Sequence, residues 1–126
     1  MNSKNEGPEV IYAYTRVQAL EDGDLVDVTT WARQSAGATM PTAFTRALWG
    51  ALEAIPNKIE DVRGRAHDVL FLMSHAIRRA PKESDRASFH VILNTAKGQE
   101  VLVLQVQCGP GDQAEPVLTV GFPEDF

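Results

Sequence analysis

The longest helical pattern in the chain reads NKIEDVRGRAHDVLFLMSHAIRRA and runs from Asn57 to Ala80. Asn57 and Glu60 are spaced as a capping pair at its start, and Pro81 prevents it from continuing. Between these limits apolar residues recur every three or four positions, which places them on one face of a helix. They are Ile59, Val62, Ala66, Val69, Leu70, Met73, Ala76, Ile77 and Ala80. The pattern predicts a helix at about 58–80 that forms the spine of the domain.

Shorter helical patterns precede this helix. The first follows a capping box formed by Thr15 and Gln18 and ends at Gly23. The second is predicted at about 29–37, and the third begins near position 41 or 42 and ends before Pro56. The apolar stripe of the third consists of Phe44, Leu48, Leu52 and Ile55. Their spacings of four, four and three are typical of a helix.

The period of the apolar residues changes from 3.6 to 2 in the last third of the chain. This alternation predicts strands at 88–95, 100–107 and 115–122. Their short connections favour antiparallel pairing. Residues 25–28 read as an extended connector, and 9–14 as a short strand whose place in the sheet is open. We therefore predict an α+β fold in which N-terminal helices pack on a C-terminal three-stranded antiparallel meander.

Composition predicts one globular domain, with residues 1–8 as a flexible lead and 9–126 as the folded part. The hydrophobic fraction is 44% and the charged fraction 23%, close to the globular average. Cys108 is the single cysteine, so the chain forms no internal disulfide, which suits a reducing compartment. No apolar run approaches the length of a membrane span, and the polar N-terminus does not resemble a signal peptide. A cytoplasmic, acidic protein without membrane contact is expected.

The residue types required for metal binding or catalysis are sparse. Three histidines (His67, His75 and His90) and one cysteine lack the spacing of a metal site. Cys108 has no basic neighbour in sequence that would activate its thiol, so it reads as a small apolar residue. The segment 109–111, Gly-Pro-Gly, is followed by an aspartate and a strand rather than a helix, so it is a turn and not a phosphate loop. We expect no cofactor, no metal and no catalytic residues, and an enzyme is the less favoured class.

A second face of the long helix is the candidate partner surface. His67, Phe71 and His75 lie four residues apart on it. The favoured interpretation places Phe71 in the core with the histidines beside it, and the competing one is a shallow groove floored by Phe71. Cations gather on the same helix, because residues 58–86 hold seven basic and five acidic residues. The full candidate surface is Arg63, Arg65, His67, Phe71, His75, Arg78 and Arg79.

Several blocks of the sequence resemble a known family. The first reads EVIYAYTRVQALEDGDLVDV, from Glu9 to Val28, and fits the pattern E-V-I-Y-x-Y-T-R-x-Q-A-x-E-D-G-x-L-V-D-V. Residues 61–65, 108–112 and 116–125 are also similar. The family consists of small uncharacterised proteins from bacterial phages, plasmids and integrative elements. The resemblance implies an origin in a mobile genetic element, and it implies no activity or functional residue.

A non-enzymatic binding protein is the function that these observations favour. It would modulate or inhibit a host protein, such as a component of a defence system, by protein–protein contact. The alternative is association with nucleic acid through the basic end of the long helix, which the net charge of −5 disfavours. Homodimerisation is compatible with both hypotheses.

Overall fold

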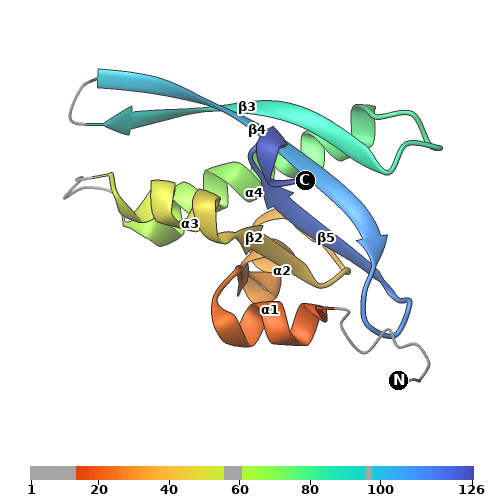
Figure 1. Ribbon diagram of the computed structural model, residues 1–126. Helices are drawn as coiled ribbons and strands as arrows, with labels where there is room; N and C mark the ends of the chain where they lie inside the picture. The colour runs from red at the N-terminus through yellow and green to blue at the C-terminus, as the bar shows by residue number, and fades with distance from the viewer. Residues whose placement is uncertain (1–13, 56–60, 96–97) are drawn as a thin grey trace.

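The computed structural model describes residues 14–55, 61–95 and 98–126. Its centre is a five-stranded mixed sheet with the strand order β1-β2-β5-β4-β3 (Figure 1). The strands are β1 (Leu25–Asp27), β2 (Thr42–Thr45), β3 (Arg86–Thr95), β4 (Gly98–Pro110) and β5 (Pro116–Gly121). The helices are α1 (Arg16–Asp22), α2 (Thr29–Ala36), α3 (Arg46–Glu53), α4 (Val62–Arg79) and the short 3₁₀ helix η2 (Pro123–Asp125). The fold is therefore α+β.

The prediction of a three-stranded antiparallel meander is wrong. β4 does pair antiparallel with β3 and with β5, but β5 also pairs in parallel with β2, and β2 pairs antiparallel with β1. The sequence pattern missed β1 and β2 because both are short. All four residues of β2 are buried, so no alternation of polar and apolar residues marks it as a strand. Phe44 belongs to this strand and not to the predicted third helix, which begins after it at Arg46.

The first two helical patterns are confirmed. The capping box of Thr15 and Gln18 begins α1, and Gly23 ends it in the left-handed conformation at φ 80°. α1 receives a second cap from the β4–β5 turn, because the Asp112 carboxylate accepts hydrogen bonds from the amides of Arg16 (2.8 Å) and Val17 (3.0 Å). An anion at this position also complements the helix dipole.

The helix α4 begins later than the sequence pattern predicted. Asp61 is its N-cap, and the Asp61 side chain accepts a hydrogen bond from the Gly64 amide at 2.9 Å. The predicted capping pair at Asn57 and Glu60 lies outside the described residues, as does the predicted strand at 9–14. Figure 1 shows α4 crossing one side of the sheet, while the β3–β4 hairpin extends beyond it.

The main core lies between the sheet and the helices α2, α3 and α4. Alternate residues of β2, β3, β4 and β5 face it, so that Phe44, Phe89, Leu104 and Val120 pack with Leu70. The opposite face of the sheet is only partly covered. There the Arg16 side chain of α1 donates a hydrogen bond to Thr119 of β5. Thr119 lies between the core residues Leu118 and Val120, so its side chain points to the face opposite the core. In the described ranges, no helix combines the length and the apolar character that crossing a bilayer requires.

Candidate functional site

The outward face of α4 carries an exposed aromatic side chain. Phe71 is 47% exposed, so the favoured interpretation of this residue as part of the core is wrong. The His67 ring lies nearly parallel to it at 6.2 Å between centroids, and the His75 ring meets it edge-on at 4.7 Å. Because these residues are four positions apart, one helix face holds all three rings in a row. The result is a row of three rings along this face, in which His67 and Phe71 are exposed and His75 is half-buried.

A shallow groove lies beside the start of this row, between α2 and α4. Its volume is about 410 Å³, and it is lined by Trp31 rather than floored by Phe71. The Arg63 guanidinium lies 5.9 Å above the Trp31 ring, and its Nη2 donates a hydrogen bond to Gln34 Oε1 at 3.1 Å. His67 Nδ1 and Ser35 Oγ are joined by a hydrogen bond of 2.7 Å. These contacts connect Arg63 and His67 of α4 to α2.

The other candidate arginines occupy different positions. Arg65 is 4% exposed, and its Nε donates a hydrogen bond to the Leu52 carbonyl at 2.8 Å. It therefore connects α3 to α4 and does not lie on the outward face. Arg78 and Arg79 are exposed in the last turn of α4, where cations suit the helix dipole. Neither guanidinium lies within ion-pair distance of an acidic side chain in the described parts of the chain.

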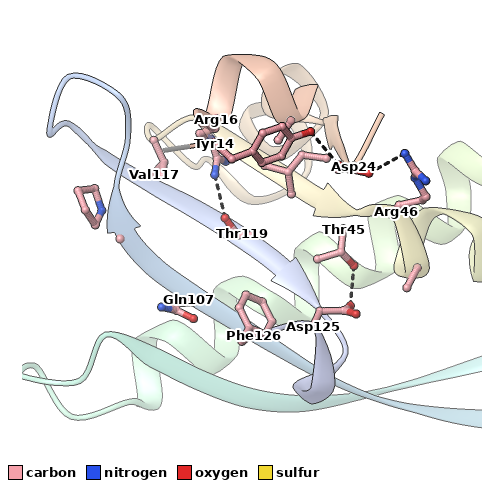
Figure 2. A pocket seen from close by; sticks show the side chains of 15 residues that line it. Tyr14, Arg16, Asp24, Thr45, Arg46, Gln107, Val117, Thr119, Asp125 and Phe126 are labelled. Carbon is pink, nitrogen blue, oxygen red and sulfur yellow. Dashed lines mark hydrogen bonds and ion pairs between the residues drawn. The ribbon is translucent and has the colours of Figure 1, made fainter. Parts of the chain in front are cut away.

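A larger cleft lies on the sheet face opposite α4, between α1 and the C-terminal residues (Figure 2). Its volume is about 730 Å³, within the range of ligand pockets. Arg16 donates to Thr119 Oγ1 and to the Leu118 carbonyl, both at 2.9 Å, and burial lowers its pKa. Thr45 Oγ1 donates to Asp125 Oδ2 at 2.8 Å. Sequence reasoning missed this cleft because Arg16 and Thr119 are far apart in the chain.

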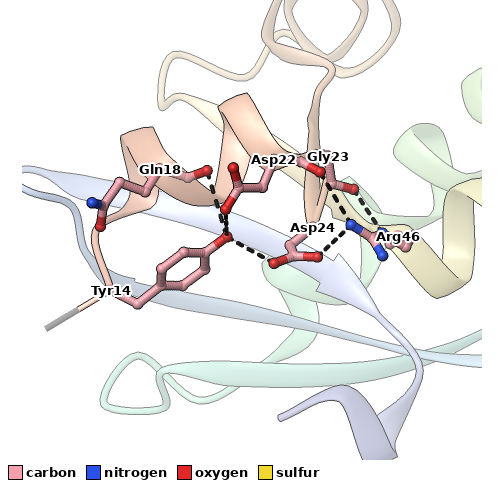
Figure 3. Close-up of polar contacts among 6 residues, drawn as sticks. All are labelled: Tyr14, Gln18, Asp22, Gly23, Asp24 and Arg46. Carbon is pink, nitrogen blue, oxygen red and sulfur yellow. Dashed lines mark hydrogen bonds and ion pairs between the residues drawn. The ribbon is translucent and has the colours of Figure 1, made fainter. Parts of the chain in front are cut away.

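A polar cluster forms the rim of the cleft at α1 (Figure 3). The Tyr14 hydroxyl lies 2.8 Å from Asp22 Oδ2 and 2.7 Å from Asp24 Oδ2. These bonds to Asp24 and Asp22 stabilise the neutral phenol and raise the pKa of Tyr14 well above its ordinary value. Asp24 Oδ1 also contacts Arg46 Nη2 at 2.6 Å, and Arg46 Nε donates to the Gly23 carbonyl at 3.1 Å.

The polar groups of the cleft are already used within the protein. The side chains of Arg16, Arg46, Tyr14 and Asp125 all bond to other residues of the chain. Their geometry holds α1 and the C-terminal residues to the sheet, and it leaves few polar atoms for a ligand. We therefore interpret the cleft as the place where α1 and the C-terminal residues are attached to the sheet. The outward face of α4 is the better candidate for binding.

Reactive chemistry finds little support in the described residues. The thiol of Cys108 is partly buried, and its Sγ donates a weak hydrogen bond to Met40 Sδ at 4.0 Å, a partner that is not a base and does not activate the thiol. Across 14–55, 61–95 and 98–126, no three side chains of the types that ligate metals come together as a candidate site.

The whole chain matches one protein family. The family model for a family of unknown function, DUF6573, covers residues 1–126, so the chain belongs to that family. No curated protein and no solved structure matches the chain. Any assignment of function therefore depends on the surfaces described above.

Proposed function

We propose that this member of the family is a non-enzymatic protein that acts by binding another protein through the outward face of α4. The observation that carries the proposal is the exposed Phe71 ring held between His67 and His75. Aromatic and arginine side chains supply most of the binding energy in many protein interfaces. Here Arg63 and Arg78 flank the aromatic row on the same helix. Cations near both ends of an aromatic row suit an acidic partner surface.

The partner class that we propose is a protein of a bacterial host, with the chain acting as an accessory protein of a mobile genetic element in the cytoplasm. The support for this origin is the resemblance of the blocks at Glu9–Val28, 61–65, 108–112 and 116–125 to the mobile-element family. The genes beside the coding sequence give a direct test. Integrases, replication genes or conjugation genes are expected there, and housekeeping operons in several genomes would contradict the origin.

The binding function can be tested with a photo-crosslinking amino acid placed at position 71 and, as the control, at position 17. Val17 is 55% exposed and lies on α1, away from the outward face of α4. We expect a discrete crosslinked protein from position 71 in host cells and none from position 17. Phe71→Ala should weaken binding of the recovered partner at least about tenfold. Ile77→Ala, at a 40% exposed residue elsewhere on α4, should leave binding nearly unchanged.

Nucleic-acid association is the alternative function. The burial of Arg65 removes one cation from the candidate surface, so fewer charges remain for phosphate contacts. A salt titration with duplex and single-stranded DNA separates the two functions, because phosphate contacts lose affinity steeply as salt rises. Binding that is measurable at low salt and falls in this way would favour the alternative over the protein-binding proposal.

A further inference from the structure

The sheet has two edges, and they differ in length and protection. β1 forms one edge with three residues, whereas β3 forms the other with ten. Natural edge strands are often protected by shortness, bulges, proline or lysine. β3 pairs with β4 in an uninterrupted register and contains neither proline nor lysine. The β3 edge is therefore long and lacks these protective features.

The hydrogen bonds show which backbone groups of β3 point outward. The Cys108 amide donates to the Asp85 carbonyl at 2.7 Å, so residue 85 faces β4. Hydrogen-bonded and non-hydrogen-bonded pairs alternate in an antiparallel ladder, so the backbone groups at even positions from 86 to 94 face away from β4. Arg86 agrees with this, because Ser84 Oγ accepts from its amide at 3.3 Å and donates to its carbonyl at 2.7 Å.

Four residues beyond Arg86 keep open backbone groups at this edge. They are Ser88, His90, Ile92 and Asn94, and all four side chains are exposed. In the part of the chain that the structure describes, no backbone or side-chain group forms a hydrogen bond with these outward amides and carbonyls. An extended chain pairs with such an edge through its own backbone.

A groove runs beside the edge, between β3 and the C-terminal half of α4. Its volume is about 530 Å³. Leu72 and Ala76 of α4 and the core residue Phe89 give it an apolar lining. A strand added to β3 would place alternate side chains in this groove and the others beside Ile92 on the open face. Ile92 is 60% exposed and pairs across the hairpin with Val101, which is 57% exposed, so an apolar row already leads to the edge.

Arg79 is the charged side chain that α4 contributes to the groove, next to His75. Arg86 and His90 of β3 also border the groove, but they share the parity of Ile92, so their side chains point to the open face of the sheet. No aspartate or glutamate of the described ranges lines the groove. Asp85 Oδ1 lies 3.2 Å from Arg86 Nε, but Arg79 has no acidic partner among described residues. A carboxylate on an incoming strand would therefore meet a cation that lacks a counter-charge.

We propose that β3 receives an extended acidic segment of a partner protein as a sixth strand of the sheet. The backbone of the segment pairs with Ser88, His90 and Ile92, and the carboxylates on its groove-facing side approach Arg79. The inference rests on the proposed protein-binding function and deepens it. His75 links the two surfaces, because it lines the groove and also contacts the Phe71 ring.

The test uses the full chain and an acetylated, amidated octapeptide that alternates valine and glutamate. Alternation lets the peptide present either face by a shift of one residue. In amide NMR titrations at low salt, we expect saturable shifts at residues 88, 90 and 92 and slower hydrogen exchange of their amides. The counterpart with lysine in place of glutamate, and the one with alternate backbone nitrogens methylated, should bind at least about tenfold more weakly.

Two variants locate the binding on the molecule. His90→Pro removes an outward amide, which an edge strand tolerates, and should abolish the shifts while the thermal unfolding transition stays cooperative. Asn94→Pro makes the same change on the same edge beyond the groove and should weaken binding less than about threefold. Arg79→Gln should weaken the glutamate peptide at least about fivefold, whereas Arg33→Gln on α2 should not.

Three outcomes would overturn the inference. The first is absence of saturable shifts at millimolar peptide, and the second is equal binding of the lysine and glutamate peptides. The third is a dimer in sedimentation experiments that His90→Pro dissociates, because a second copy would then occupy the edge. Crosslinking from position 71 that persists in His90→Pro separates this inference from the proposed function, since in that case only the edge pairing fails.

Discussion

The Tyr14 hydroxyl illustrates how one side chain depends on its immediate neighbours. It is exposed, yet it lies within hydrogen-bond distance of two carboxylates, those of Asp22 and Asp24. A phenolate at this place would face two negative charges and lose the bonds that the neutral hydroxyl makes. The folded state therefore holds the phenol proton more tightly than the unfolded chain does.

This arrangement predicts the tyrosine titration. The sequence has two tyrosines, so in a Tyr12→Phe background the tyrosinate absorbance reports Tyr14 alone. We expect its midpoint to lie above the ordinary value of 10.0, and Asp22→Asn with Asp24→Asn should return it toward that value. Because the folded pKa is raised, the stabilisation is present below pH 10 and is lost as the pH rises above it. A midpoint near 10 in the Tyr12→Phe protein would contradict these hydrogen bonds.

Arg65 shows what sequence reasoning at the residue level lacked. The candidate surface includes both Arg63 and Arg65, which are close in the sequence, but two positions on a helix turn a side chain by about 200°. Arg63 consequently lies over Trp31, while Arg65 lies in the interior against the Leu52 carbonyl. The helical period alone predicts that Arg63 and Arg65 lie on different faces of α4. The contact of Arg65 with α3 could not be predicted from the sequence, because it depends on how the two helices pack in the fold.

At the scale of elements, β5 and the C-terminal η2 helix are fitted tightly to β2. A Cβ atom added at Gly121 would lie 2.5 Å from Thr45 Cγ2 and 2.7 Å from Asp125 Oδ2. The absence of a side chain at 121 therefore lets Thr45 and Asp125 form their hydrogen bond directly over the strand. Gly50 in α3 differs, because a Cβ there would meet nothing within 4 Å.

Alanine at these two glycines should have opposite effects on stability. Gly121→Ala forces neighbouring atoms apart and should lower the free energy of unfolding by about 1–3 kcal/mol. Gly50→Ala places a better helix former in an open position and should raise it by about 0.5–1 kcal/mol. Urea unfolding measures both, and a neutral or stabilising Gly121→Ala would show that Thr45 and Asp125 are not held close to the strand.

Elements with strong local signals could be predicted from the sequence, and those defined by distant partners could not. The capping box of Thr15 and Gln18, the left-handed Gly37 and the apolar period of α4 are all local. β2 is a strand because β1 and β5 pair with it on either side, and four buried residues carry no period of their own. The cleft at Arg16 was hidden for the same reason, since Thr119 comes from β5.

For the whole molecule, one core joins the N-terminal and C-terminal parts of the chain. Phe44 of β2 is fully buried and packs in the same cluster as Leu70 of α4, Leu104 of β4 and Val120 of β5. The antiparallel strands β3, β4 and β5 are thus one part of a sheet that is completed by residues before α4. A loss of packing at β2 should therefore destabilise both the sheet and the helices that cover it.

Phe44→Ala tests this shared core. We expect it to lower the free energy of unfolding by about 3–5 kcal/mol, while Phe126→Ala, at a 43% exposed residue, should change it by less than about 1 kcal/mol. In the unmodified protein, tryptophan fluorescence and far-ultraviolet circular dichroism should give coincident urea transitions. Separate transitions would mean that the two parts of the chain unfold independently.

The parallel pairing of β2 with β5 has a consequence for how the chain acquires its structure. Seventy residues, 46 through 115, separate the two strands, and the α1 cap from Asp112 spans a still longer distance. Closing such distant contacts slows folding, because the entropy of ordering the intervening chain is lost before the contacts form. On the ribosome, β2 therefore remains without its parallel neighbour until the final strand emerges. The native sheet is completed only after that strand has been synthesised.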